Sequence, residues 1–291
     1  MVVALAIALA VALLAGAMPP SRTARANRAA LLSDRYPMCK HGAEFRIDFG
    51  ESVHIETFEI AERFCGPPRS GNGGYVCGRI AQYLPGSVTV RLKLPPPLNA
   101  LLRLESGDAQ AHLFHDSALV GEAKCAELDL PVPPSPSYEA AVQSAQSYAG
   151  FTKHAFPGCF VCGTQRKALD GLRIFPGAVN GSDVIAAPWQ PDASLADDAG
   201  NIKPEFLWSA LDCTGAFAVM PLSEGVATVL GELSAKLMEP LTPDERCVVL
   251  GWPISIKGRK RQAGTAIYTE SGRLVAKAHA IWIEVPASTW S

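Results

Sequence analysis

The sequence carries little net charge and few charged residues. It has 26 Lys and Arg against 28 Asp and Glu, and these residues together make up 19% of the chain. A chain without a positive excess gives no indication of a nucleic-acid partner. Hydrophobic residues make up 48% of the sequence, which argues against a disordered chain and predicts a globular core.

The N-terminal segment lacks the positive charge of a secretory signal. Residues 2–18 are almost wholly apolar and Ala24-Arg25-Ala26 is similar to a cleavage site, but no Lys or Arg precedes Arg22. The apolar run is also shorter than the ~20 residues of a membrane span. Three interpretations of residues 1–35 stay open: an atypical signal or anchor, a helix docked on the domain, or a start assigned too early.

The eight cysteines lack the pattern of a disulfide framework. Several of them lie in apolar runs, where a free thiol behaves as a small hydrophobic group. A chain of 291 residues can bury a core without disulfides, so we expect free thiols in a reducing compartment. This predicts a cytoplasmic protein, although the apolar N-terminal run leaves a secreted or membrane-tethered form open.

The chain after Gly50 shows the same order of elements twice. The first half is predicted as a strand at 53–60, a helix at 74–84, and strands at 87–94, 101–105, 109–115 and 119–128. The second half is predicted as a strand at 183–189, a helix at 204–220, and strands at 227–238, 246–256, 262–270 and 273–285. Residues 119–131 align without gaps with residues 274–286, and both segments end in acidic–aliphatic–Pro. The order therefore indicates an internal duplication.

The boundaries of the two halves follow from proline content and alternation. Ser87 to Leu94 alternates apolar and polar residues, which is typical of a half-buried strand. The segment LDLPVPPSPS, residues 128–137, is too rich in proline for a strand interior. We therefore expect one unit at 36–130, a linker at 131–150 and a second unit at 151–286.

The first predicted helix begins on glycines, in the stretch RSGNGGYVCGRIAQYLPG from Arg69 to Gly86. A helix N-terminus carries unpaired N–H groups and a positive partial charge, and glycine allows a ligand to approach that backbone. The stretch is therefore a candidate binding site for an oxygen that bears negative charge. A tight turn with a glycine-rich cap is the alternative.

Several motifs together resemble the hotdog fold of acyl-CoA thioesterases in its tandem form. They are Asn72-Gly73-Gly74-Tyr75 before SVTVRLKLPPPL, Ala210-Leu211-Asp212-Cys213-Thr214-Gly215, and Cys159-Phe160-Val161-Cys162-Gly163 with Gly171-Leu172-Arg173 after it. The resemblance implies an α+β double hotdog, in which two helices are each wrapped by an antiparallel sheet and form an intrachain pseudo-dimer. It also implies hydrolysis of an acyl-CoA or acyl-carrier-protein thioester without a cofactor, and a possible homo-oligomer of such units.

The family pattern places His-Gly-Gly at the helix start and an acid nine positions later. The first half has Asn72, Gly73 and Gly74 at the helix start but Ala81 at the ninth position. The second half begins on Lys203-Pro204-Glu205, which offers no glycine, but has Asp212 at the ninth position. The resemblance therefore predicts one composite site, with Gly73 and Gly74 as oxyanion donors and Asp212 as the catalytic acid. The alternatives are that Asp212 has a structural role and that Asn72 is only the N-cap of the helix.

Other candidate residues have weaker support. Asn72 and Tyr75 at the helix start, and Arg259 and Lys260 in the basic loop 257–261, are candidate substrate-binding residues, the loop for CoA phosphates. A solvated turn explains that loop equally well. His112 and His115 point to opposite faces of a strand and form a poor metal pair. Cys213 is a candidate nucleophile, but a core thiol is the simpler interpretation.

Zinc-ligand spacing occurs once, in Cys159-x2-Cys162 with His154 before it. A structural zinc site needs four ligands, and no second Cys or His pair with matching spacing follows, so we predict no tightly bound zinc. Two other functions stay open: a hotdog module that binds acyl thioesters or lipids without turnover, and a hydratase or dehydratase. The latter usually requires an Asp/His pair near the helix start, which the sequence does not offer.

Overall fold

The fold was analysed in a computed structural model that describes residues 53–290. The interpretations of residues 1–35, and the start of the first predicted unit, lie outside the described residues. The strands are β1 (His54–Glu59), β2 (Val88–Leu92), β3 (Leu101–Ser106), β4 (Gln110–His115), β5 (Ala118–Cys125), β6 (Gly177–Ala178), β7 (Ile185–Trp189), β8 (Val226–Leu237), β9 (Cys247–Lys257), β10 (Lys260–Thr269) and β11 (Leu274–Pro286). The helices are α2 (Gly73–Ala81), α3 (Tyr138–Ala145) and α4 (Pro204–Ala218), with short 3-10 turns at Glu62–Phe64, Ala149–Phe151, Ala193–Leu195 and Ala287–Trp290.

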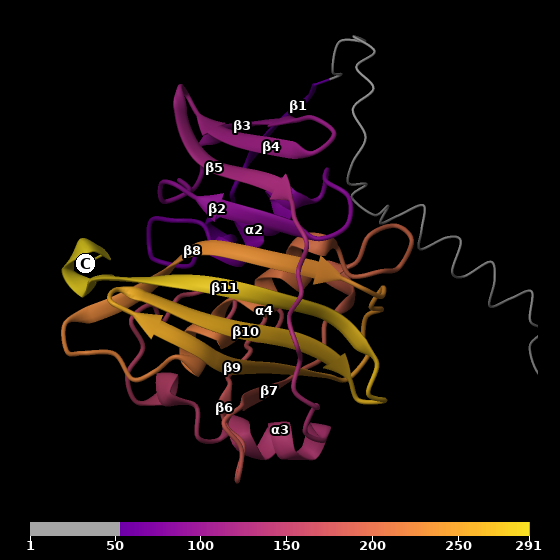
Figure 1. The fold of residues 1–291 in the computed structure, drawn as a ribbon, viewed down its shortest axis with the longest axis vertical. Coiled ribbons are helices and arrows are strands. Elements are labelled where there is room, and N and C mark those ends of the chain that lie inside the picture. The colour runs from indigo at the N-terminus through magenta and orange to yellow at the C-terminus, as the bar shows by residue number, and fades with distance from the viewer. Residues whose placement is uncertain (1–52, 291) are drawn as a thin grey trace, which may run out of the picture. The chain divides into compact units, whose positions relative to one another are not determined.

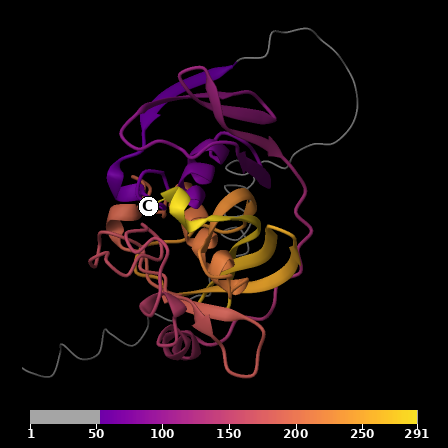
Figure 2. The ribbon, with the colours of Figure 1, turned by 90° about the vertical axis from the view of Figure 1, so that its left-hand side faces the viewer.

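All described strands form one antiparallel sheet in the order β1-β3-β4-β5-β2-β8-β11-β10-β9-β7-β6 (Figure 1). Outward from the centre, β2-β5-β4-β3-β1 has the same connectivity as β8-β11-β10-β9-β7, so the two halves repeat one topology with β6 added. The halves meet where β2 pairs with β8, from Val88 opposite Ala235 to Arg91 opposite Glu232. Figure 2 shows the strands of the first half, in indigo to magenta, above the orange and yellow strands of the second.

Helices α2 and α4 contact each other and cover the two halves of the sheet. α2 contacts β2, β4 and β5 together with β8, and α4 contacts β7 to β11. The predicted α+β class, with a helix for each half and contact between the helices, is confirmed. Both helices are shorter at their C-terminal ends than predicted. Within residues 53–290, no helix combines the length and the apolar character that crossing a membrane requires.

Two glycines of α2 bring its backbone against α4. A Cβ atom at Gly74 would lie 2.5 Å from the Asp212 Cβ, and one at Gly78 would lie 2.5 Å from the Glu205 Cα. Positions four residues apart share one face of a helix, so both glycines point toward α4. The close approach therefore explains why a buried helix contains residues of low helix propensity.

The region predicted as a linker contains the helix α3, which the sequence analysis did not identify. Ser137 caps it by accepting from the Ala140 N–H at 3.1 Å, and Ala141 packs on the β7 and β9 side chains, including Ala186 and Leu250. Because successive strand residues point to opposite faces, α3 covers the face opposite to α4. This double cover explains the continuous buried run at the start of β9.

Replacement of Gly78 by Ala tests the contact between α2 and α4. Helix propensity alone would raise the free energy of unfolding by about 1 kcal/mol. The added methyl group overlaps the α4 backbone, so we expect the free energy of unfolding, measured by urea denaturation, to decrease by about 1–3 kcal/mol. The matched control is Gly107→Ala, where the nearest atom to a Cβ lies at 4.0 Å. A stabilised Gly78→Ala variant would contradict the close contact.

Candidate active site

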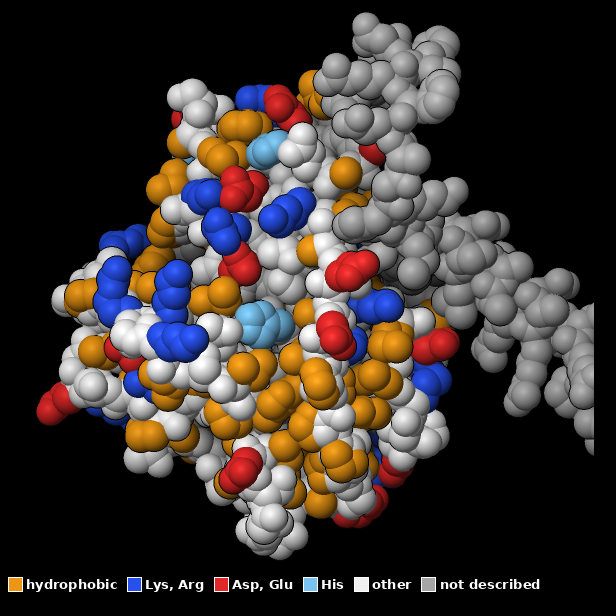
Figure 3. Space-filling model, in the orientation of Figure 1, with side chains coloured by type: hydrophobic (Ala, Val, Ile, Leu, Met, Phe, Trp, Pro, Cys, Tyr) orange, Lys and Arg blue, Asp and Glu red, His pale blue; other side chains and the backbone are white. Residues whose placement is uncertain are grey.

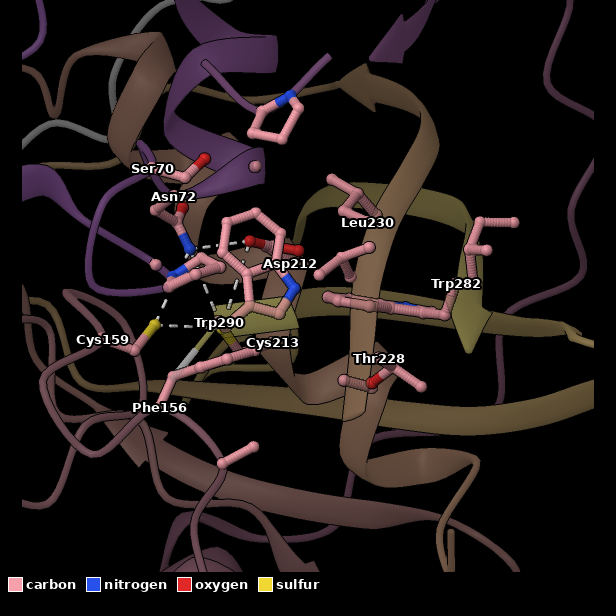
Figure 4. A pocket seen from close by; sticks show the side chains of 18 of the residues that line it. Ser70, Asn72, Phe156, Cys159, Asp212, Cys213, Thr228, Leu230, Trp282 and Trp290 are labelled. Carbon is pink, nitrogen blue, oxygen red and sulfur yellow. Dashed lines mark hydrogen bonds between the residues drawn. The ribbon is translucent and has the colours of Figure 1, made fainter. Parts of the chain in front are cut away.

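A cavity of about 270 Å³ lies at the start of α2, beside the middle of α4. Its wall is mostly apolar and comes from the α2 start, α4, the central strand β8, β11, the loop after β2 and the loop that carries Cys159 (Figure 4). Gly73 and Asp212, two of the three residues of the predicted composite site, line this cavity, and so does Asn72, a predicted substrate-binding residue. The structure therefore brings together residues from both halves of the chain.

Asp212 is a buried carboxylate held at the start of α2. Its side chain is 2% exposed, and Oδ2 accepts hydrogen bonds from the Gly74 N–H at 2.9 Å and from the Asn72 Nδ2 at 2.8 Å. Burial raises the pKa of Asp212 to about 7, although these two hydrogen bonds act in the opposite direction. Oδ1 is also buried and has no hydrogen-bond partner among the described residues. One carboxylate oxygen is thus fixed, and the other has a free lone pair.

Asn72 uses both ends of its amide group. Its Oδ1 accepts from the Tyr75 N–H at 2.9 Å and so caps α2, which is the N-cap role considered from the sequence. Its Nδ2 donates to Asp212 and lies 3.8 Å and 3.9 Å from the sulfur atoms of Cys159 and Cys213. The helix cap therefore also positions the buried acid.

The two glycines at the α2 start have different roles. The Gly74 N–H donates to Asp212 and is not available for another oxygen while that bond is made. The N–H of Gly73, at the first helical position, makes no hydrogen bond with another described residue. A Cβ at Gly73 would lie 2.8 Å from the Leu230 Cβ, so only glycine fits between α2 and β8. Gly73 is therefore the better candidate for an oxyanion donor.

Three thiols lie beside the acid. The sulfur atoms of Cys159, Cys162 and Cys213 are within 4.8 Å of one another, and all three residues are buried and line the cavity. Hydrogen bonds from the thiols of Cys162 and Cys213 hold the pKa of Cys159 well below its usual range. Cys213 had no evident partner in the sequence because Cys159 is remote from it in the chain.

Four predicted site residues do not line the cavity: Gly74, Tyr75, Arg259 and Lys260. Tyr75 is 4% exposed and stacks on Phe64 with ring centroids 4.3 Å apart, in an aromatic cluster of the core. Tyr75, which follows the glycines, is therefore a core residue. Arg259 and Lys260 lie at the turn between β9 and β10, near the C-terminal end, where Figure 3 shows Lys and Arg side chains gathered.

Several residues of the cavity wall carried no signal in the sequence. They are Ser70, Phe156, Thr228, Leu230, Trp282 and Trp290. The indole N–H groups of the two tryptophans are buried without a hydrogen-bond partner among the described residues. Thr228, Leu230 and Trp282 reach the cavity through the pairing of β8 with β11. Trp290 comes from the turn after β11, and Ser70 and Phe156 come from loops, so no local pattern shows them together.

The two roles of Asn72 predict a larger effect of its loss than that of an ordinary helix cap. Asn72→Ala removes the cap of α2 and one donor to a buried carboxylate, so we expect the free energy of unfolding to fall by about 2–4 kcal/mol. The matched control Ser137→Ala removes only the exposed cap of α3, at a cost of about 1 kcal/mol. Urea denaturation measures both. Equal losses would show that the Asn72–Asp212 bond adds nothing to stability.

Comparison with known proteins shows which solved structures share the fold of this chain. No protein-family model and no curated protein sequence matches the chain. Among solved structures, a TesB protein of Mycobacterium avium subspecies paratuberculosis has a TM-score of 0.53 at 14% identity, covering 80% of this chain and 93% of its own. The acyl-CoA thioesterase II TesB2 of Mycobacterium marinum has a TM-score of 0.53 at 12% identity, covering 81% and 94%. The resemblance to hotdog-fold thioesterases is thus confirmed at the level of the fold.

Proposed function

We propose that this chain is a double hotdog protein that hydrolyses an acyl thioester, carried by CoA or by an acyl-carrier protein. The observation that carries the proposal is the Asp212 carboxylate, held by hydrogen bonds at the start of α2 inside an apolar cavity. An apolar cavity with a few convergent polar groups suits a ligand with an apolar body and one reactive group. An acyl thioester has this character.

The proposed reaction uses one carboxylate oxygen and one backbone N–H. Asp212 accepts a proton from a water molecule through Oδ1, and the resulting hydroxide adds to the acyl carbon. The carbonyl oxygen gains negative charge and is stabilised by the Gly73 N–H at the positive end of α2. The carbon–sulfur bond then breaks, and Asp212 returns the proton to the leaving sulfur. The products are a carboxylic acid and a free thiol.

The basic turn between β9 and β10 is the proposed contact for the carrier. The Glu284 N–H donates to the carbonyl oxygen of Arg259 at 2.9 Å, and the neighbouring Ile283 lines the cavity. Arg259 and Lys260 are therefore one strand position away from the cavity wall while their side chains stay exposed. Exposed cations in this place suit the phosphates of CoA or of a phosphopantetheine arm.

We further propose a single site in each chain. At the start of α4, Lys203 provides no side-chain cap and Pro204 has no N–H to donate. The position in α2 that corresponds to Asp212 is the buried Ala81. The start of α4 and the position of Ala81 in α2 thus offer neither an oxyanion donor nor an acid for a second site.

The amide variant of the proposed base tests the function. Asp212→Asn keeps the size of the side chain but removes the base, so turnover of acyl-CoA substrates of different chain lengths, followed by thiol release, should fall at least ~100-fold. Glu205→Gln, a matched change in α4 outside the cavity wall, should leave the rate near that of the wild type. Full activity of Asp212→Asn would contradict the assignment. Binding of acyl-CoA by the wild type without turnover would favour a non-catalytic binding module.

A hydratase or dehydratase receives no support from His154, a histidine of the cavity wall. His154 accepts from the Phe156 N–H at 3.0 Å through Nδ1, which leaves the proton on Nε2, 3.1 Å from the Cys162 carbonyl oxygen. Both nitrogens are therefore engaged with the backbone, and burial lowers the pKa of His154. A neutral ring held in this way supplies no partner for an Asp/His pair.

A further inference from the structure

We propose that Cys159, Cys162 and Cys213 bind one Zn²⁺ ion in the wall of the cavity. The three sulfur atoms lie within 4.8 Å of one another, and those of Cys159 and Cys213 are 3.6 Å apart. Three thiolates at the corners of a zinc tetrahedron, with Zn–S bonds of about 2.3 Å, lie roughly 3.8 Å apart. Small side-chain rotations would bring the sulfur atoms to these distances. The site does not depend on the proposed hydrolysis.

The loop that carries the first two cysteines is a tight turn. The Gly163 N–H donates to the Cys159 carbonyl oxygen at 2.9 Å. A Cβ at Gly163 would lie 2.4 Å from that carbonyl oxygen, so the tight turn requires glycine. The turn brings the Cys159 and Cys162 sulfur atoms close together, in the Cys-x2-Cys spacing of zinc-binding loops.

The third cysteine and an outer partner come from other parts of the chain. Cys213 is presented by α4, and the Asn72 Nδ2 lies 3.8 Å from the Cys159 sulfur and 3.9 Å from the Cys213 sulfur. An N–H donor shared by two ligand atoms is the kind of outer contact that orients metal ligands. Soft thiolate ligands select zinc over the hard cations that prefer oxygen. The sequence expectation of no zinc rested on a lack of further ligands, and Cys213 supplies one.

The fourth position of the proposed site faces the cavity, which the three cysteines line. His154 is excluded because both of its nitrogens are engaged with the backbone. The Asp212 Oδ2 lies 4.0 Å from the Cys213 sulfur, and its Oδ1 is buried without a partner among the described residues. Three protein ligands with a fourth position reachable from a cavity is the arrangement of reactive zinc sites, in contrast to closed structural ones.

Metal content of the purified full chain tests the site without any activity measurement. We expect about one zinc per chain by mass spectrometry after dialysis against metal-free buffer. Cys213→Ser should weaken Zn²⁺ affinity more than ~100-fold, and Asn72→Ala, an outer partner, about 10–100-fold. The matched control is Cys247→Ser, a buried thiol in β9 outside the cluster, which should retain the wild-type zinc content.

A second measurement on the wild type keeps the proposal testable if the cysteine variants fail to fold. Reduced, metal-free protein titrated with Co²⁺ should develop the charge-transfer absorption of thiolate-bound cobalt, saturating near one equivalent, and Zn²⁺ should abolish it. Wild-type protein that contains no zinc and gives no such band would overturn the site. A Cys159–Cys213 disulfide that, once reduced, still takes up neither metal would overturn it equally.

Discussion

The close contact between α2 and α4 determines where every other feature of the site can lie. At Gly74 and Gly78 the α2 backbone meets α4 with no room for a side chain, so the two helices approach more closely than ordinary side chains allow. At this distance the Asp212 carboxylate reaches the Gly74 N–H directly. A wider spacing would place the acid beyond hydrogen-bond reach of the helix start.

That contact also explains how a carboxylate is tolerated in a nearly fully buried position. Removal of an anion from water costs several kcal/mol, and hydrogen bonds to a charged group each return about 1.5–3 kcal/mol. Gly74 and Asn72 provide two such bonds, and the α2 N-terminus adds a favourable field. The remaining cost appears as a pKa raised to about 7. A carboxylate that is incompletely compensated has the properties of a base, and its unpartnered Oδ1 is the atom that can act as one.

Much of this arrangement was predictable because it follows from local pattern and internal repetition. Alternation identified the strands, and the repeated element order predicted that the two helices meet. Compared with the family pattern that the motifs resemble, the missing acid at Ala81 and the missing donor at Pro204 then predicted that Asp212 meets the glycines of the other half. Tyr75 was assigned to the substrate from its neighbours alone, whereas the aromatic cluster with Phe64 depends on contacts from elsewhere in the chain. The α3 helix was missed because a proline-rich segment precedes it.

The thiol cluster shows why the rest of the site could not be predicted. Cys159 and Cys162 are neighbours in sequence, but Cys213 reaches them only because the loop after α3, which carries the pair, lies against α4. Asn72 connects the two groups, since one amide caps the helix, holds the acid and faces two sulfur atoms. A change at any of these positions therefore acts on the helix contact, the carboxylate and the thiols together. Single substitutions here should consequently be interpreted through double-mutant cycles, because their effects are coupled by contact.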